Sequence, residues 1–200
     1  MNPTPPDVAP SQVAGVDEAG RGPLAGPVVV AAVVLPQGHG WDGLDDSKRL
    51  SEAQREQAFD EVIARAVSYA VEVVDVEEIE RVNILAATLN GMQRSVLALD
   101  PAPKLVMVDG NRAPELKMEV KTIVEGDRWV PAISAASILA KVTRDRLMLQ
   151  YHSEWPDYGF DRHKGYPTPE HLQKLKALGP CPVHRKTFAP VREALSPGLF

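Results

Sequence analysis

Two apolar runs near the N-terminus dominate the hydrophobic pattern of the chain. The first covers residues 13–18 and closes with Asp17 and Glu18, whereas the second, residues 28–35, contains only Val, Ala and Leu. A bend rich in Gly and Pro separates them, which predicts two strands joined as an antiparallel hairpin. Because the second run has no polar position, we expect it to be a central strand that is buried on both faces.

Further along the chain, short apolar runs alternate with stripes of helical period. Ser51 and Gln54 form a capping-box motif that predicts a helix from residue 52, and Pro131 suits the first turn of another helix. In chain order, strands are predicted at residues 67–76, 104–109 and 121–125, and helices from residue 52, from 75, from 84, over 131–151 and over 169–178. Residues 155–169 are expected to form an irregular loop, and the tail beyond residue 180 shows no clear pattern.

Length and composition indicate one domain. A chain of 200 residues can bury one sizeable core, and neither a repeat nor a second domain stands out. We expect a flexible lead-in over residues 1–12 and a single domain over 13–200. The single cysteine favours a reducing compartment, the N-terminus lacks signal-peptide features, and the longest apolar run is too short for a membrane span. The sequence therefore favours a cytoplasmic protein that does not enter a membrane.

Acidic side chains stand at the ends of three apolar runs. Asp17 and Glu18 begin the bend, and Asp109 and Asp127 each follow a later run. A single acid in such a place is more often a turn residue that accepts backbone hydrogen bonds. Burial of a carboxylate within an apolar strand, however, costs several kcal/mol of folding free energy, because even a neutral polar group buried without a partner costs about 2–7 kcal/mol. Since reacting groups gather beyond strand ends in α/β sheets, the four acids together indicate a site.

The glycines of the bend leave two interpretations open. Gly20-Arg21-Gly22 is followed by Pro27 and a β-branched run rather than by a helix, and no Gly-Lys-Ser/Thr occurs, so neither common phosphate-binding motif is present. The glycines can serve a tight hairpin that needs their dihedral freedom. Alternatively, the backbone of the bend approaches a ligand closely and Arg21 points towards an anionic group.

The net charge of −5 argues at first against a nucleic-acid partner, but its distribution does not. Residues 1–140 contain 12 Lys and Arg against 21 Asp and Glu, whereas residues 141–192 contain 10 against 5. An acidic body can bind cations while a basic C-terminal quarter faces phosphate. A chance asymmetry on a solvated surface explains the charges equally well.

Three further stretches carry candidate phosphate contacts. Ser134, Ser137, Lys141 and Arg144 share a face of the predicted helix, which is either solvated or a phosphate-contacting edge. Lys48 belongs either to a solvated loop or to a site where it meets phosphate as a point charge. The stretch 155–169 interleaves basic residues with aromatic ones, a mixture suited to nucleic acid, although Trp155 and Phe160 are expected to form an aromatic mini-core. Its candidate members are Trp155, Tyr158, Phe160, Arg162, His163, Lys164 and Tyr166.

The chemistry of four acids favours hard divalent cations. No His or Cys cluster has zinc spacing, and the lone thiol lies in a Pro-rich segment. Carboxylates without soft ligands suit Mg²⁺ or Mn²⁺, and two such ions ~3.5–4 Å apart can cleave a phosphodiester. The residues therefore indicate a metal-dependent nuclease, with a non-catalytic nucleic-acid-binding module as the alternative in another class.

Long ordered motifs resemble those of bacterial ribonuclease HII, the type 2 ribonuclease H. The resemblance covers nearly the whole chain, and the short N-terminus and the Gly-Arg-Gly motif favour type 2 over type 3. The motifs are G-V-D-E-A-G-R-G-P-L-A-G-P-V from Gly15, D-S-K-R-L-S from Asp46, V-D-G-N-R from Val108, G-D from Gly126, S-A-A-S-I-L-A-K-V-T-R-D from Ser134, H-K-G-Y-P-T from His163 and H-R-K-T-F from His184.

The resemblance implies an α/β ribonuclease H-like fold, with a central mixed β-sheet flanked by helices and a C-terminal helical extension from about residue 152. It implies that four residues bind two divalent ions, Mg²⁺ or Mn²⁺: Asp17, Glu18, Asp109 and Asp127. It further implies that the Gly20-Arg21-Gly22 backbone senses a ribose 2′-hydroxyl and that Tyr166 stacks on the sugar at an RNA–DNA junction. Phosphate contacts would come from Lys48, Ser134, Ser137, Lys141, Arg144 and Lys164.

The implied reaction is cleavage on the 5′ side of a ribonucleotide in an RNA–DNA hybrid or in duplex DNA. The products carry 3′-hydroxyl and 5′-phosphate ends, and the cut begins removal of misincorporated ribonucleotides. We expect the enzyme to act as a monomer. Another metal-dependent nuclease of the same fold, such as a junction resolvase or a transposase, is an alternative. His184 is a candidate general base, although we favour a structural role for it.

Overall fold

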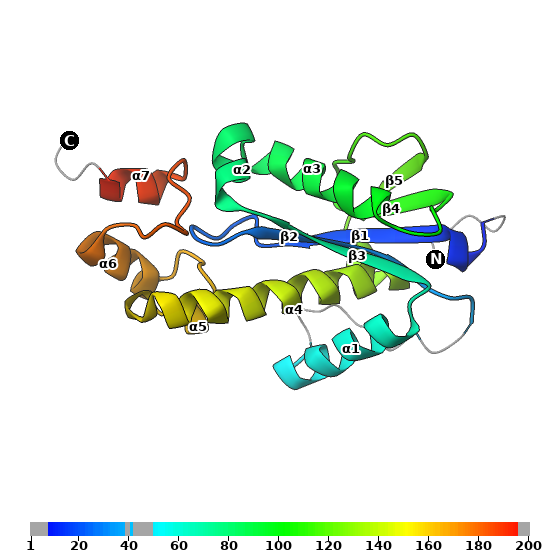
Figure 1. Ribbon diagram of the computed structural model, residues 1–200, viewed down its shortest axis with the longest axis horizontal. Helices are drawn as coiled ribbons and strands as arrows, with labels where there is room; N and C mark the ends of the chain where they lie inside the picture. Colours follow the sequence, from blue (N-terminus) through cyan, green and yellow to red (C-terminus); the bar gives the residue numbers. More distant parts are fainter. Residues whose placement is uncertain (1–7, 39–40, 42–49, 196–200) are drawn as a thin grey trace.

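The computed structural model describes residues 8–38, residue 41 and residues 50–195. Five strands form one mixed sheet in the order β3-β2-β1-β4-β5 (Figure 1). They are β1 (Val13–Ala19), β2 (Val28–Val34), β3 (Ser68–Val74), β4 (Leu105–Asp109) and β5 (Glu119–Ile123). The predicted hairpin is confirmed because β1 and β2 are antiparallel, whereas β1 and β4 are parallel, as are β4 and β5.

Helices cover both faces of the sheet (Figure 1). One face packs against α1 (Glu52–Arg65) and α4 (Pro131–Glu154), and the other against α2 (Val76–Val82) and α3 (Ile84–Leu97). Alternate residues of β2 enter the two cores, with Val29 and Val33 in one and Val28 and Val30 in the other. The prediction of a strand buried on both faces is therefore confirmed. The Ser51–Gln54 capping box is present and begins α1 as predicted.

The first turn of α4 lies directly on β1. A Cβ added at Gly15 would collide with the backbone of Ala132, so this strand position needs glycine for the close approach. Ala135 and Ala136 continue the contact as small buried residues. This packing places one side of α4 against the strand that carries Asp17 and Glu18.

The C-terminal extension contains four short elements, η3 (Pro156–Tyr158), α5 (Phe160–His163), α6 (Pro169–Leu178) and α7 (Ala189–Leu195). The prediction of an irregular loop over 155–169 is wrong, since η3 and α5 lie within it, and α7 was not predicted. In Figure 1 the extension lies beyond the β1–β2 bend. Hydrogen bonds join the two, from Leu24 N to Gly165 O and from Gly26 N to Val183 O, both 2.8 Å.

Two short 3-10 turns complete the fold. Residues of the predicted lead-in form η1 (Pro10–Gln12), where the carbonyl of Gln12 accepts a hydrogen bond from Lys104 N at 2.9 Å. The second, η2 (Gly126–Arg128), follows β5 and carries Asp127. Within the part of the chain that the structure describes, no helix is long and apolar enough to cross a membrane.

Candidate active site

Asp17 and Asp109 come from adjacent parallel strands. Val16 of β1 is paired with Val108 of β4, so the acid that follows each of them stands at the same level of the sheet. Asp17 is only 6% exposed. Burial raises its pKa well above the ordinary value, and the nearby charges of Glu18 and Asp109 raise it further. The structure thus brings three of the four predicted acids into electrostatic contact.

Hydrogen bonds hold the Asp17 carboxylate in place and partly offset the rise in its pKa. The Glu18 backbone N–H donates to Asp17 Oδ1 at 2.7 Å, and the side chain of Ser137 on α4 is a further partner. Ser134 and Ser137 are both buried. The α4 face predicted to be solvated or to contact phosphate is therefore buried at these two positions, and Ser137 supports the acidic site.

Asp109 connects β4 to the turn that carries the fourth acid. The backbone N–H of Gly126 donates to Asp109 Oδ1 at 2.7 Å, and Asp127 is the next residue of η2 and is buried. A Cβ at Gly126 would lie 2.6 Å from Ile133 Cδ1, so this close approach favours glycine. Asp127 is thus attached to the acidic site through its neighbour.

The four acids have the donor chemistry of a cation site, but their side chains are not gathered as closely as the ligands of a bound metal ion. Among the residues that the structure describes, no group of three or more His, Cys, Asp or Glu side chains could hold a metal ion as they stand. Their oxygen-only donors nevertheless suit hard divalent cations. The repulsion that raises the pKa of Asp17 is what a cation would relieve. In donor chemistry and charge, the residues present therefore fit a divalent cation.

The glycine bend lies between the acids and Tyr166. Arg21 Nη1 is 3.3 Å from Glu18 Oε1, which connects the bend to the acidic site. A Cβ at Gly22 would lie 3.6 Å from Tyr166 Cε1, an ordinary van der Waals distance. Gly20 has a φ of +99°, and an added Cβ there would collide with the Arg144 side chain. The conformation of the bend therefore requires glycine at position 20, whereas position 22 has room for a methyl group.

Arg185 holds the bend from beneath. Its guanidinium is fully buried and donates to the carbonyls of Gly20 at 2.6 Å and Pro23 at 2.8 Å. It also donates to Arg21 O at 3.0 Å and to Gly26 O at 2.9 Å. Burial lowers its pKa to about 9. Arg185 belongs to the H-R-K-T-F motif, but nothing local in the sequence marks an arginine that donates to carbonyls 159–165 positions away.

The prediction that Arg144 is an exposed phosphate contact is not supported. Its side chain is 1% exposed, and its three guanidinium nitrogens donate to Pro27 O, Lys164 O and Ala25 O at 3.0–3.1 Å. Desolvation lowers its pKa to about 10. Arg144 therefore joins the bend to the extension as a structural residue.

The other predicted contacts differ in exposure. Tyr166 is 44% exposed. Of the two residues expected in the aromatic mini-core, Phe160 is buried beside Tyr158, and Trp155 is half-buried against the same cluster. The Lys141 ammonium pairs with Asp145 and that of Lys164 donates to Asp161 O. Lys48 lies outside the described residues.

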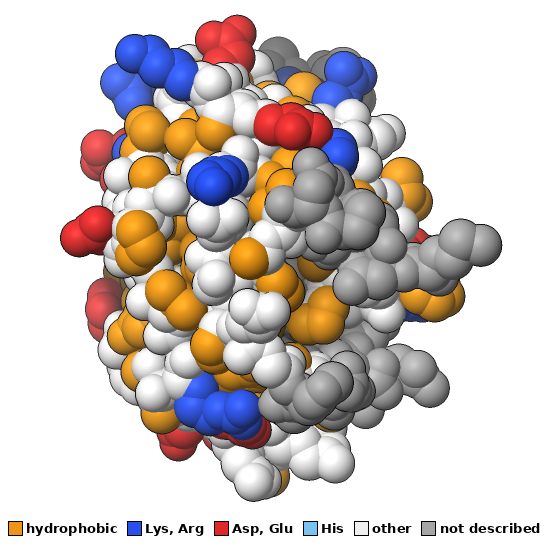
Figure 2. Space-filling model, turned by 90° about the vertical axis from the view of Figure 1, so that its right-hand side faces the viewer, with side chains coloured by type: hydrophobic (Ala, Val, Ile, Leu, Met, Phe, Trp, Pro, Cys, Tyr) orange, Lys and Arg blue, Asp and Glu red, His pale blue; other side chains and the backbone are white. Residues whose placement is uncertain are grey.

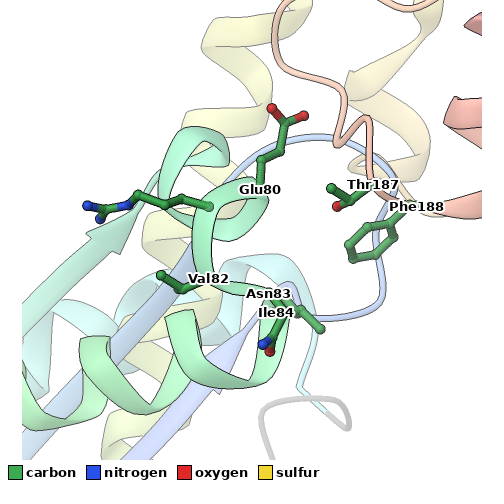
Figure 3. A pocket seen from close by; sticks show the side chains of 7 residues that line it. Glu80, Val82, Asn83, Ile84, Thr187 and Phe188 are labelled. Carbon is green, nitrogen blue, oxygen red and sulfur yellow. The ribbon is translucent and has the colours of Figure 1, made fainter.

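The segment before α7 borders a cavity close to the bend, since Phe188 in the cavity lining lies under the Arg185 guanidinium, with Cζ 5.2 Å from the ring centroid. The cavity, of about 460 Å³, lies between the α2–α3 corner and the segment before α7 (Figure 3), and its lining, which includes Glu80, Asn83 and Phe188, contains none of the predicted site residues. On the face shown in Figure 2, Lys and Arg side chains and Asp and Glu side chains are scattered among apolar ones. Neither view adds a candidate to the acidic site.

Comparisons with known proteins agree with this geometry. Residues 14–191 match the model of a family described as Ribonuclease HII. Proteins named ribonuclease HII from Burkholderia mallei (strain SAVP1) and from Burkholderia thailandensis are each 58% identical over 182 residues, which is 91% of this chain and 85% of the relative.

Solved structures share the fold. The ribonuclease H2 of Pyrococcus horikoshii OT3 is 29% identical with a TM-score of 0.79, over 91% of this chain and 96% of that one. The chain from the PCNA:RNase HII complex of Archaeoglobus fulgidus is 27% identical with a TM-score of 0.71, over 89% and 95%. Bst-RNase HIII in complex with Mn²⁺, at 19% identity and a TM-score of 0.70 over 94% and 70%, shows the fold alone.

The matched region includes the hairpin, the four acids, the bend and Tyr166, and the expected ribonuclease H-like fold is confirmed. The agreement extends over most of the length of both this chain and its relatives. The chain therefore belongs to the ribonuclease HII family, whose members are nucleases that hydrolyse RNA–DNA hybrids.

Proposed function

We propose that this protein hydrolyses the phosphodiester on the 5′ side of a ribonucleotide, in an RNA–DNA hybrid or embedded in duplex DNA. The products carry 3′-hydroxyl and 5′-phosphate ends, and the cut begins removal of misincorporated ribonucleotides. The observation that carries the proposal is the position of the glycine bend, which is tied to Glu18 through Arg21 and borders Tyr166 at Gly22. The proposed ribose-reading element thus stands beside the acids.

The four acids form the proposed catalytic centre. Asp17, Glu18, Asp109 and Asp127 would hold two divalent cations, Mg²⁺ or Mn²⁺, which when bound activate water and stabilise the leaving oxygen. The chain itself orients the acids, since hydrogen bonds fix Asp17 through Ser137 and Asp109 through Gly126. The oxygen donor set supports the assignment.

Recognition is assigned to the bend and to the extension. The 2′-hydroxyl distinguishes RNA from DNA, and a glycine backbone can approach it closely. Because Arg185 and Arg144 occupy the carbonyls of the bend, its conformation is set before a substrate arrives. The exposed ring of Tyr166 would stack on the sugar at the junction.

Phosphate contacts are assigned to three lysines. Lys141 and Lys164 would each exchange a surface oxygen partner for phosphate, and Lys48 would add a point charge. We also propose that the protein acts as a monomer and, from its single cysteine, in the reducing cytoplasm. The PCNA complex is a property of the Archaeoglobus protein.

Product mapping on a duplex with one ribonucleotide tests the reaction. With Mg²⁺ or Mn²⁺ we expect a single cut on the 5′ side of the ribonucleotide, and no cut after addition of EDTA. Binding without cleavage in either metal would support a non-catalytic nucleic-acid-binding module instead. Cleavage of an all-DNA duplex would support another nuclease of the same fold.

A further inference from the structure

Three buried histidines lie behind Tyr166, and the proposed chemistry uses none of them. His163 is at the end of α5, His171 is in α6, and His184 lies in the segment before α7. The His163 and His171 rings stack with their centroids 4.4 Å apart, and Nε2 of His171 is 3.0 Å from Nε2 of His184. The extension thus contains a compact imidazole cluster.

The hydrogen-bond donors fix the tautomer of His184 and His171. The backbone N–H of Cys181 donates to His184 Nδ1 at 3.0 Å, so a neutral His184 carries its proton on Nε2. That proton is donated to Nε2 of His171, which must then carry its own proton on Nδ1. His171 Nδ1 in turn donates to the carbonyl of Tyr166 at 2.9 Å. Three hydrogen bonds therefore run in one direction from Cys181 to Tyr166.

The backbone around Tyr166 is restrained on every side. Its N–H donates to His163 O at 2.8 Å, and Gly165 N donates to His163 Nδ1 at 3.2 Å. Gly165 has a φ of +83°, and a Cβ there would lie 2.6 Å from Ala25 O. Tyr166 is 44% exposed, and its ring edge faces Gly22. Its carbonyl accepts hydrogen bonds from Thr168 N at 2.8 Å and from His171 Nδ1, so the imidazole chain is one of the two restraints that hold this carbonyl.

Other roles for the cluster do not fit the structure. His184 is fully buried and both of its ring nitrogens have partners, so it does not reach a substrate proton. Burial raises the pKa of the Cys181 thiol to about 11, which leaves it un-ionised and unreactive at neutral pH. Among the described residues, no such group is arranged to hold a metal ion.

We propose that His171 and His184 are positioning residues that fix the Tyr166 ring against the RNA–DNA junction and thereby set the preference for a single ribonucleotide. The inference rests on the proposed function, in which Tyr166 contacts the sugar at that junction. A change in either histidine should alter the preference through Tyr166 alone, and a double-mutant cycle measures such coupling.

The test compares kcat/KM on a one-ribonucleotide duplex with kcat/KM on a uniform RNA–DNA hybrid. His171→Leu should lower this ratio about five- to tenfold, the effect of one buried hydrogen bond. His171→Asn, which can keep a donor near Tyr166 O, should restore most of it. His152→Leu is the matched control. Nδ1 of this α4 histidine lies 3.2 Å from Asp161 Oδ1, outside the imidazole cluster, so the substitution should leave the ratio unchanged. In a Tyr166→Ala background, His171→Leu should have no further effect.

The outcomes separate the two proposals. A wild-type enzyme without junction preference, or a Tyr166→Ala variant that keeps it, would overturn the proposed role of Tyr166 and this inference with it. If Tyr166→Ala loses the preference and His171→Leu retains it, only the positioning role is wrong. Should His171→Leu not fold, ¹⁵N NMR of the wild-type imidazoles decides. We expect neutral His171 protonated on Nδ1 and neutral His184 protonated on Nε2, and any other state would overturn the inference.

Discussion

Asp17 illustrates how a residue can be placed for chemistry at the expense of stability. Its carboxylate is buried and lies beside the charges of Glu18 and Asp109, and both conditions disfavour its ionised form. A raised pKa means that the folded state binds a proton more readily than the unfolded state does. Burial of Asp17 therefore destabilises the fold at neutral pH, where the unfolded chain has an ionised carboxylate, and this cost diminishes as the pH falls below the raised pKa towards the ordinary value of 3.8.

Replacing this acid should separate stability from activity. In Asp17→Asn the amide keeps the shape of the side chain and removes the buried charge, so we expect a higher melting temperature at pH 7 without added metal. Cleavage of a one-ribonucleotide duplex should fall by about 100-fold or more, as when a directly acting group is removed. Thermal melting and single-turnover kinetics check the two parts. A variant that melts lower yet cuts at the wild-type rate would contradict both.

At the scale of the element, the β1–β2 bend contains two glycines with different requirements. Gly20 combines a left-handed φ of +99° with a collision between any Cβ and Arg144, whereas Gly22 meets Tyr166 only at 3.6 Å. Local sequence does not distinguish them, since both occur in the same Gly-Arg-Gly motif. The difference arises because Arg144 approaches one of them from the distant helix α4.

A pair of alanine substitutions tests this difference. Gly20→Ala should destabilise the fold by about 1–3 kcal/mol or more, the cost of a strained backbone together with a clash. Gly22→Ala should stay within about 0.5 kcal/mol of the wild type, yet lose discrimination for the ribonucleotide through steric exclusion of the 2′-hydroxyl. Denaturant unfolding and the ratio of cleavage on ribonucleotide-containing and all-DNA duplexes measure the two effects. Equal stability losses in the two variants would contradict the assignment.

How much of these elements the sequence predicts depends on the range of the interactions involved. The hairpin, the α1 cap and the strand-end acids follow from neighbouring residues, and the structure confirms them as local features. Arg144 and Ser137 share a helix face by spacing, but periodicity cannot say whether that face meets water or β1. Burial of Arg144 depends on carbonyls supplied from positions 25, 27 and 164. Helix α7 was missed because its seven residues carry too short a pattern.

At the scale of the whole molecule, the histidine cluster links stability to pH. Burial and the neighbouring rings lower the pKa of His184 to about 4, below its usual 6.5, and the pKa of His171 is lowered as well. Between pH 6.5 and about pH 4, the two pKa values of His184, the unfolded chain binds a proton at position 184 that the folded chain does not. Stability is therefore full above about pH 6.5 and is lost as the pH falls towards 4.

The loss can be measured against a variant without the titrating ring. For His184 alone the shift corresponds to about 3 kcal/mol at pH 4, since one pKa unit is about 1.4 kcal/mol. We expect the free energy of unfolding of the wild type to fall more steeply between pH 6.5 and 4.5 than that of His184→Gln. Urea titrations at several pH values give both slopes. Parallel slopes would show that His184 titrates normally in the folded protein.

The two arginines beneath the bend have a consequence for synthesis of the chain. The bend is translated within the first 30 residues, but its carbonyls receive their hydrogen bonds from Arg144 and Arg185, and the Arg185–Gly20 pair spans 165 positions. At a synthesis rate of ~5–20 residues per second, roughly 10–30 s pass on the ribosome between the synthesis of Gly20 and the synthesis of Arg185. During this interval a nascent chain already has Asp17 and Glu18 but lacks the support that shapes its proposed ribose reader. Competence to recognise a substrate therefore arises only after Arg185 has been synthesised and has reached the carbonyls of the bend.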